Sequence, residues 1–172
     1  SSIYLGSSSG KYKELNEDIF GQDLEGQFGL IDLKKNRYKD LILLGRNSFN
    51  EAKTQVYQNS GSNPIKFVNY DSLQLPNLLN ANSFIEDFNN DGFLDLITTD
   101  ANAIRVRVLM NDGDDTFTYM GLTPTDSSIR LHGTVVADFD NDGDIDIFYV
   151  DYYSALAYFK NNGDGTFTET SL

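Results

Sequence analysis

Cysteine is absent from the 172-residue sequence, so neither disulfide bonds nor cysteine–zinc sites hold this chain together. Histidine occurs once, as His132, which excludes most nucleophile–base pairs unless His132 supplies the imidazole. No apolar run approaches the roughly 18 residues of a membrane span. We therefore expect no membrane span in this segment, and we interpret His132 as an ordinary polar residue just before a strand.

Positive charge is scarce as well. Lys and Arg together number 13 against 26 Asp and Glu, which gives a formal net charge of −13 at pH 7. So acidic a chain repels a phosphate backbone, which argues against nucleic acid as a partner. Many of the acidic residues fall in one repeated motif, and this motif is the most informative feature of the chain.

Two nine-residue segments, loop 87–95 and loop 138–146, place oxygen-bearing side chains at alternate positions. The alternation directs the odd positions inward, and glycine at position six permits a sharp turn. Calcium binds six to eight oxygen ligands of this kind, so we predict one ion in each loop. The predicted ligands are the side chains at positions one, three, five and nine with the carbonyl of position seven: Asp87, Asn89, Asp91, Phe93 and Asp95, and Asp138, Asp140, Asp142, Asp144 and Asp146.

Loop 32–40 is a third copy of the motif that departs from the pattern. It has Lys34 at position three and Arg37 at position six, where the other two loops have glycine. A lysine in place of an oxygen ligand opposes cation binding, so we expect this loop to hold no ion. Lys34 is then expected to act as an internal counter-ion for Asp32 and Asp40.

An EF-hand and a solvated turn are the two other interpretations of the acidic loops. An EF-hand needs Glu at position twelve and flanking helices, whereas position twelve here is Thr98 or Tyr149. The residues that follow each loop, 96–99 and 147–150, are β-branched and aromatic and favour strands. Solvated turns are the second interpretation. The full ligand pattern recurs at the same place in a repeat, which favours calcium.

The motif recurs with a period of about fifty residues, because the three loops begin at residues 32, 87 and 138. A glycine-rich hairpin signature at 111–117 returns at 161–167 with the same period. One four-stranded unit of this size must stack on a neighbour to bury both faces, so we predict an all-β fold of β-propeller blades. In the last unit the predicted strands are 133–137, 145–150, 155–159 and 166–170.

The loop motif and the hairpin signature together resemble the FG-GAP or VCBS repeats of integrin-α-like β-propellers. In that family the acidic loop joins the first two strands of each blade, and a complete ring has about six to eight blades. The resemblance implies three blades at residues 28–70, 81–121 and 131–172, with residues 1–14 as the last two strands of a preceding blade. We expect a fragment whose partners include the remaining blades of the same propeller. The alternative is that several chains associate into a ring.

We see no catalytic constellation in the sequence, so we expect a non-enzymatic module. The resemblance implies adhesion or recognition with protein or glycan ligands. Calcium sites of extracellular modules have Kd values of roughly 10⁻⁴ to 10⁻³ M, which indicates a secreted or cell-surface protein. The alternatives are the scaffold of a secreted polysaccharide lyase or hydrolase and a structural part of a surface assembly. Tyr119, Tyr152 and Tyr153 are candidate recognition residues, unless they pack between blades.

Overall fold

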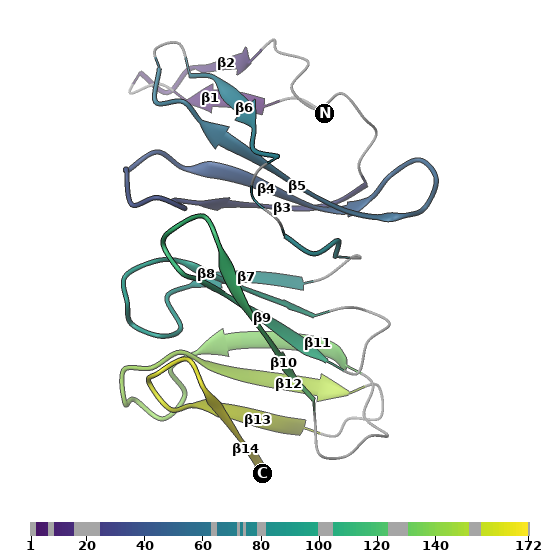
Figure 1. Ribbon diagram of the computed structural model, residues 1–172, viewed down its shortest axis with the longest axis vertical. Helices are drawn as coiled ribbons and strands as arrows, with labels where there is room; N and C mark the ends of the chain where they lie inside the picture. The colour runs from purple at the N-terminus through teal and green to yellow at the C-terminus, as the bar shows by residue number, and fades with distance from the viewer. Residues whose placement is uncertain are drawn as a thin grey trace.

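The computed structural model contains strands, turns and irregular segments throughout the residues that it describes (Figure 1). Three four-stranded antiparallel sheets and one two-stranded hairpin make up its architecture, which confirms the all-β prediction. No described segment forms an apolar helix of membrane-crossing length. The described residues are 3–6, 9–15, 25–62, 65–71, 73, 75–78, 82–99, 105–123, 131–151 and 156–171.

Each sheet is a meander in which every strand pairs with the next strand along the chain. The first sheet contains β3 (Glu25–Ile31), β4 (Asp40–Arg46), β5 (Ala52–Asn59) and β6 (Phe67–Asn69). The second contains β7 (Asn82–Glu86), β8 (Asp95–Thr99), β9 (Val106–Asn111) and β10 (Phe117–Leu122). The third contains β11 (Leu131–Ala137), β12 (Asp146–Asp151), β13 (Leu156–Asn161) and β14 (Phe167–Ser171). The hairpin consists of β1 (Ile3–Gly6) and β2 (Tyr12–Leu15).

The third sheet tests the strand prediction most directly. Its four strands begin and end within two residues of the predicted positions. One detail was wrong, because His132 lies inside β11 rather than before it. The pairing of β11 with β12 shifts register between Leu131 and Gly133, so His132 is the extra residue of an irregularity that the sequence pattern did not reveal.

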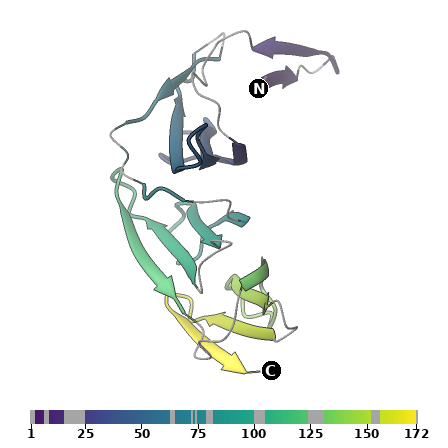
Figure 2. The ribbon, with the colours of Figure 1, turned by 90° about the vertical axis from the view of Figure 1, so that its right-hand side faces the viewer.

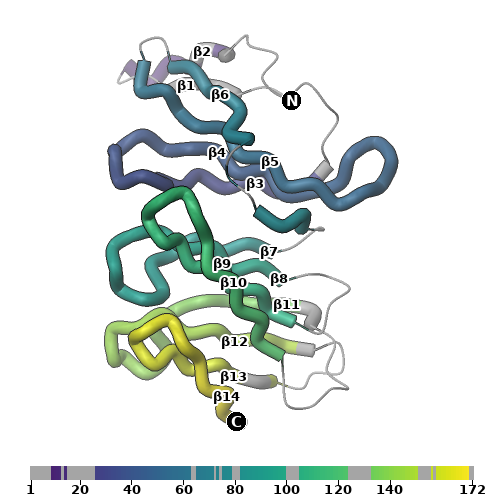
Figure 3. Tube along the Cα trace, in the orientation of Figure 1, coloured from purple at the N-terminus to yellow at the C-terminus, as the bar shows by residue number. Residues whose placement is uncertain are grey.

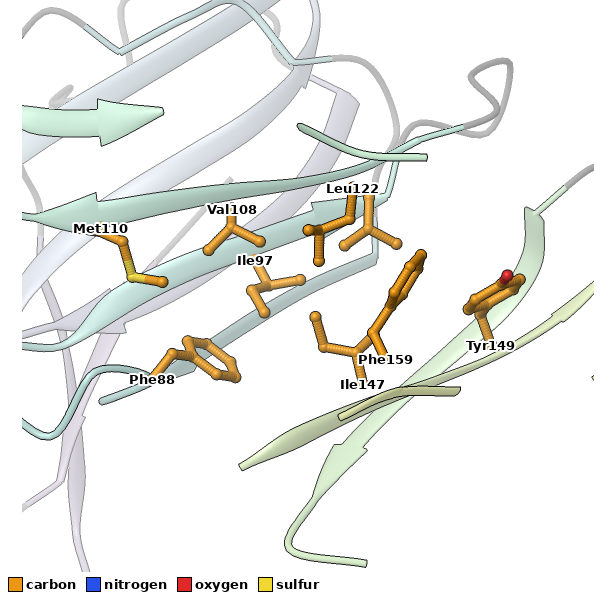
Figure 4. Packing of buried hydrophobic residues seen from close by; sticks show 9 residues of the cluster. Phe88, Ile97, Val108, Met110, Leu122, Ile147, Tyr149 and Phe159 are labelled. Atoms are coloured by element: carbon orange, nitrogen blue, oxygen red, sulfur yellow. The ribbon is translucent and has the colours of Figure 1, made fainter. Parts of the chain in front are cut away.

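Buried side chains lie mainly between neighbouring sheets. All five residues of β8 are buried, because sheets cover both faces of this central strand. Leu96 packs toward the first sheet and Ile97 toward the third, as expected for alternating strand residues. Figure 4 shows the cluster between the second and third sheets. It includes Phe88, Ile97, Val106, Val108, Met110, Leu122, Ile147, Tyr149 and Phe159.

The three sheets follow one another along an arc, with the first strands on its concave side and the fourth strands on its convex side (Figure 2). The first strands are in contact, since β7 touches both β3 and β11. This radial order is that of propeller blades. It also brings loops 32–40, 87–95 and 138–146 to the same edge of the molecule, each between the first and second strands of its sheet (Figure 3).

Candidate metal centres

The aspartate at position one closes the turn in both intact loops. In loop 87–95 the Asp87 carboxylate accepts hydrogen bonds from the backbone N–H of Asp91 at 3.1 Å and of Gly92 at 2.8 Å. The equivalent residues of loop 138–146 make the same two bonds, at 3.1 and 3.0 Å. The glycines at position six have φ values of 82° and 98°, a left-handed conformation that glycine adopts without steric cost.

The aspartate at position nine anchors each loop to the sheet behind it. Asp40, Asp95 and Asp146 have 0% of their surface exposed. Each carboxylate accepts one backbone N–H from position two of its own loop, at 2.8 to 3.2 Å. Each also accepts the backbone N–H of an asparagine at the end of the third strand: Asn59 at 2.8 Å, Asn111 at 2.8 Å and Asn161 at 2.9 Å.

Burial perturbs the protonation of Asp95 and Asp40. Desolvation raises the pKa of Asp95 to about 6, although the two backbone hydrogen bonds act in the opposite direction. The pKa of Asp40 is raised for the same first reason. A buried carboxylate is costly in its charged form unless a cation or hydrogen-bond donors compensate it. Position nine of loop 87–95 is therefore a site where a bound cation would be stabilising.

Three of the predicted ligands converge in loop 138–146. One carboxylate oxygen from each of Asp138, Asp140 and Asp146 lies within 4.8 Å of the other two. Calcium ligands lie 2.3–2.6 Å from the ion, so two of them on opposite sides are about 5 Å apart. The spacing and the purely oxygen donor set therefore fit a hard cation such as calcium.

The other two predicted ligands of this loop have neighbours that the sequence did not indicate. Asp142 accepts a hydrogen bond from the Lys160 ammonium at 2.8 Å, and this contact holds the pKa of Asp142 below its ordinary value. The same ammonium contacts Asp140. The Asp144 side chain accepts a hydrogen bond from Asn90 of the preceding loop at 2.7 Å, so it links the two loops.

Loop 87–95 has the same turn but a less charged ligand set. Asn89 occupies position three, and its side-chain oxygen accepts the Asp91 N–H at 3.1 Å. Its amide group also donates to the Asp91 carboxylate at 2.9 Å. Asp91 in turn accepts the Phe93 N–H at 2.7 Å. Positions three, five and seven are thus joined within one turn, and every predicted donor is an oxygen.

Lys34 is not the direct counter-ion of Asp32 and Asp40 that we predicted. Its ammonium pairs with Asp115 of the second sheet at 3.1 Å and lies 4.9 Å from the centre of the Tyr70 ring. Its charge still lowers the pKa of Asp40, but as the smallest of the contributing causes. The long side chain reaches a partly exposed carboxylate on the neighbouring sheet, where the ammonium keeps more of its hydration than inside the loop.

The sequence also left unassigned the asparagines that bond to the position-nine aspartates. Asn111 and Asn161 begin the repeated hairpin signature, so their recurrence was visible, but their bonds to Asp95 and Asp146 depend on which strands are adjacent.

Among the candidate recognition tyrosines, Tyr119 lies in β10 with 52% of its surface exposed. Tyr152 and Tyr153 lie outside the described residues.

A family model for the FG-GAP-like repeat matches residues 87–149 and 138–172, which together make up half of the chain. The chain belongs to the FG-GAP-like repeat family. The matched FG-GAP-like repeats contain loops 87–95 and 138–146. Loop 32–40, which departs from the motif at Lys34 and Arg37, lies before the matched residues.

A solved structure supports the propeller fold. It is that of an Agrocybe aegerita lectin described as specifically recognising non-reducing terminal N-acetylglucosamine. The match has a TM-score of 0.62 and 20% sequence identity, and it covers 98% of this chain and 45% of the lectin chain. At this identity the likeness shows the fold alone. This chain therefore spans less than half the length of the lectin chain. A search of curated proteins found no match.

Proposed function

We propose that this chain is a calcium-stabilised, non-catalytic recognition segment of a secreted or cell-surface β-propeller. The observation that carries the proposal is the convergence of Asp138, Asp140 and Asp146 in a turn whose donors are all oxygens. A bound ion would neutralise carboxylates that folding brings close together in a strongly acidic chain. The millimolar calcium that such sites require is available outside the cell.

Glycans are the ligands that we propose. The loops of three successive sheets lie at one edge of the arc, where ordered polar groups are presented on a rigid scaffold (Figure 3). Hydrogen bonds between carboxylates and backbone amides hold these loops in shape, which limits the entropy lost on binding a flexible sugar chain. The description of the Agrocybe aegerita lectin as recognising N-acetylglucosamine supports a glycan over a protein ligand.

Calcium stoichiometry tests the metal part of this proposal. Native mass spectrometry of the wild-type chain should show two bound ions, and the Asp142→Ala variant should show one. Calcium at ten times its Kd should stabilise each site by about 1.4 kcal/mol, so Asp142→Ala should lose about that much calcium-induced stabilisation in thermal unfolding. The comparison is made within each variant, with and without chelator, because Asp142 also accepts the Asp144 N–H.

Asn36→Ala in loop 32–40 is the matched control. Asn36 occupies position five of that loop and accepts only the Tyr38 N–H among the hydrogen bonds seen at its side chain. This variant should retain two ions. Equal stoichiometry in the wild type, Asp142→Ala and Asn36→Ala would contradict the assignment of loop 138–146.

The glycan part is tested separately. Binding of the calcium-loaded chain is measured on immobilised glycans that end in N-acetylglucosamine, with glycans ending in galactose as the comparison. Binding to either set that is lost in chelator supports a calcium-dependent lectin-like role. Release of sugar products during the same incubation would instead show catalysis, and absence of binding to all glycans would reject glycan recognition by this segment.

A further inference from the structure

Lys160 distinguishes the loop 138–146 site from the loop 87–95 site. It is the residue before Asn161 on β13, and its ammonium contacts the carboxylates of Asp140 and Asp142. These are positions three and five of the loop, so a protein cation already occupies two of the five predicted calcium ligands. The backbone of Lys160 is fixed beside the loop, because Lys160 pairs with Thr168 of β14.

The second sheet has no lysine in the equivalent place. Asn111 corresponds to Asn161, since each donates its backbone N–H to the aspartate at position nine of its own loop. The residue before Asn111 is Met110, which is 6% exposed and packs in the cluster between the second and third sheets. The two loops therefore have similar backbones but different cation contacts. The Lys160 ammonium lies on carboxylates of loop 138–146, whereas at loop 87–95 the Lys35 ammonium donates to the backbone carbonyl of Asp91 at 2.9 Å.

The charge of the predicted ligands and the neighbouring lysine have opposite effects on the calcium affinity of loop 138–146. The predicted ligands of loop 138–146 include four carboxylates, whereas those of loop 87–95 include three carboxylates and the Asn89 side-chain oxygen; position seven contributes its backbone carbonyl in both loops. Calcium affinity rises with the number of charged ligands, so the charge count favours loop 138–146. Lys160 opposes this preference, because a calcium ion must displace the ammonium from Asp140 and Asp142 and then bind beside a positive charge.

We propose that Lys160 is a tethered competitor of calcium at loop 138–146: it neutralises the loop in the absence of the ion and lowers the affinity of the loop when the ion binds. This inference rests on the proposed calcium function. It assigns the two repeats different roles. Loop 87–95 keeps its ion as external calcium falls, and loop 138–146 exchanges calcium for an ammonium without losing its shape.

The direct test is Lys160→Met, which introduces the residue found in the second sheet. Calorimetric titration with calcium is performed in an Asp91→Ala background, so that loop 138–146 is the site that responds. Removal of the competing ammonium should tighten calcium binding roughly two- to fivefold, the range expected for an exposed ion pair. The control is Lys53→Met on β5, which removes the same charge from the first sheet and should leave the affinity nearly unchanged.

Thermal unfolding of the parent and Lys160→Met, in chelator and in saturating calcium, gives a second measurement. In chelator, Lys160→Met should unfold at a lower temperature than the parent, because Asp140 and Asp142 lose their cation. With saturating calcium the difference should shrink or reverse, so the calcium-induced rise in Tm should be larger in the variant.

The outcomes separate this inference from the proposed function. Equal affinity of the parent and Lys160→Met would overturn the role of Lys160 while leaving calcium binding intact. Equal tightening by Lys53→Met would show a general charge effect and would also overturn it. Absence of calcium binding in parent and variant alike would overturn both the inference and the calcium part of the proposed function.

Discussion

At the scale of single residues, the aspartate at position nine anchors its loop to the sheet, and in loops 87–95 and 138–146 it is also a predicted calcium ligand. In all three loops it is buried and receives two backbone N–H groups, so it joins the loop to the third strand of its sheet. Loop 32–40 keeps this residue as Asp40 although two of its other motif positions have changed. Asp40 therefore stabilises the fold in a loop where we expect no ion. The motif thus indicates folding as well as metal binding.

The pKa values of Asp95 and Asp40 test this distinction. In chelator, an NMR titration should give Asp95 a midpoint of about 6 and Asp40 a midpoint above its ordinary 3.8. Calcium should lower the Asp95 midpoint, because the ion favours the charged form, and should leave Asp40 unchanged. Equal shifts at both residues, or no shift at Asp95, would contradict calcium binding in loop 87–95.

The same raised pKa has a consequence for stability in chelator. The folded chain keeps a proton on Asp95 at pH values where the unfolded chain has lost it. The contribution of Asp95 to the free energy of unfolding is therefore complete below about pH 3.8 and is lost as the pH rises to about 6.

At the scale of the loop, Arg37 shows that the turn forms without glycine at position six. Arg37 has a φ of 74° at the position where the other loops have glycine, and its N–H still donates to Asp32 at 2.8 Å. A left-handed conformation costs a residue with a Cβ about 1–2 kcal/mol. The bonds that Asp32 accepts from Asn36 and Arg37 help to offset this cost.

Arg37→Gly should therefore stabilise the chain. Glycine relieves the strain but increases the freedom of the unfolded chain, so we expect a net gain of about 0.5–1 kcal/mol in the free energy of unfolding. Chemical denaturation measures this difference. Arg37→Ala keeps a Cβ and should give no comparable gain, and equal stabilisation by the two variants would show that backbone strain is not the cause.

At the scale of the whole molecule, asparagines join the second and third sheets to the sheet before each of them. The side-chain amide of Asn161 donates to the carbonyl of Phe88 at 2.7 Å and to that of Ile145 at 3.1 Å. Asn111 makes the equivalent pair of bonds to Leu33 at 3.2 Å and to Leu94 at 3.3 Å. These bonds lie beside the apolar clusters between sheets, so they set the position of one sheet on the next as well as adding stability.

Asn161→Ala should reveal this connection. It leaves the buried carbonyl of Phe88 and the partly buried carbonyl of Ile145 without that amide, and it also removes the bond from the Gly163 N–H to the Asn161 side chain. We expect a loss of about 2 kcal/mol in the free energy of unfolding. Asn162→Ala changes the neighbouring exposed asparagine, whose amide donates to Thr166, and should cost less than about 0.5 kcal/mol. Similar losses in the two variants would contradict an inter-sheet role for Asn161.

The sequence by itself determined the repeat period, the number of strands in each unit, the acidic loops and the family. These features depend on residues close together in the chain: alternating apolar residues specify strands, and the spacing of Asp, Asn and Gly specifies a turn. The third sheet therefore lies close to its predicted position, while the short range of these signals explains why the register irregularity at His132 was missed.

Only the tertiary structure decided which groups from distant parts of the chain meet at the loops. Lys34 contacts Asp115 on the next sheet, and Lys160 contacts Asp140 and Asp142 from 20 and 18 residues further along the chain. The position-nine aspartates find asparagines on the third strands because β-strand order makes those strands neighbours. A local motif can specify the oxygen donors of a site. The cations and amides that compete for those donors are placed beside the site by tertiary packing.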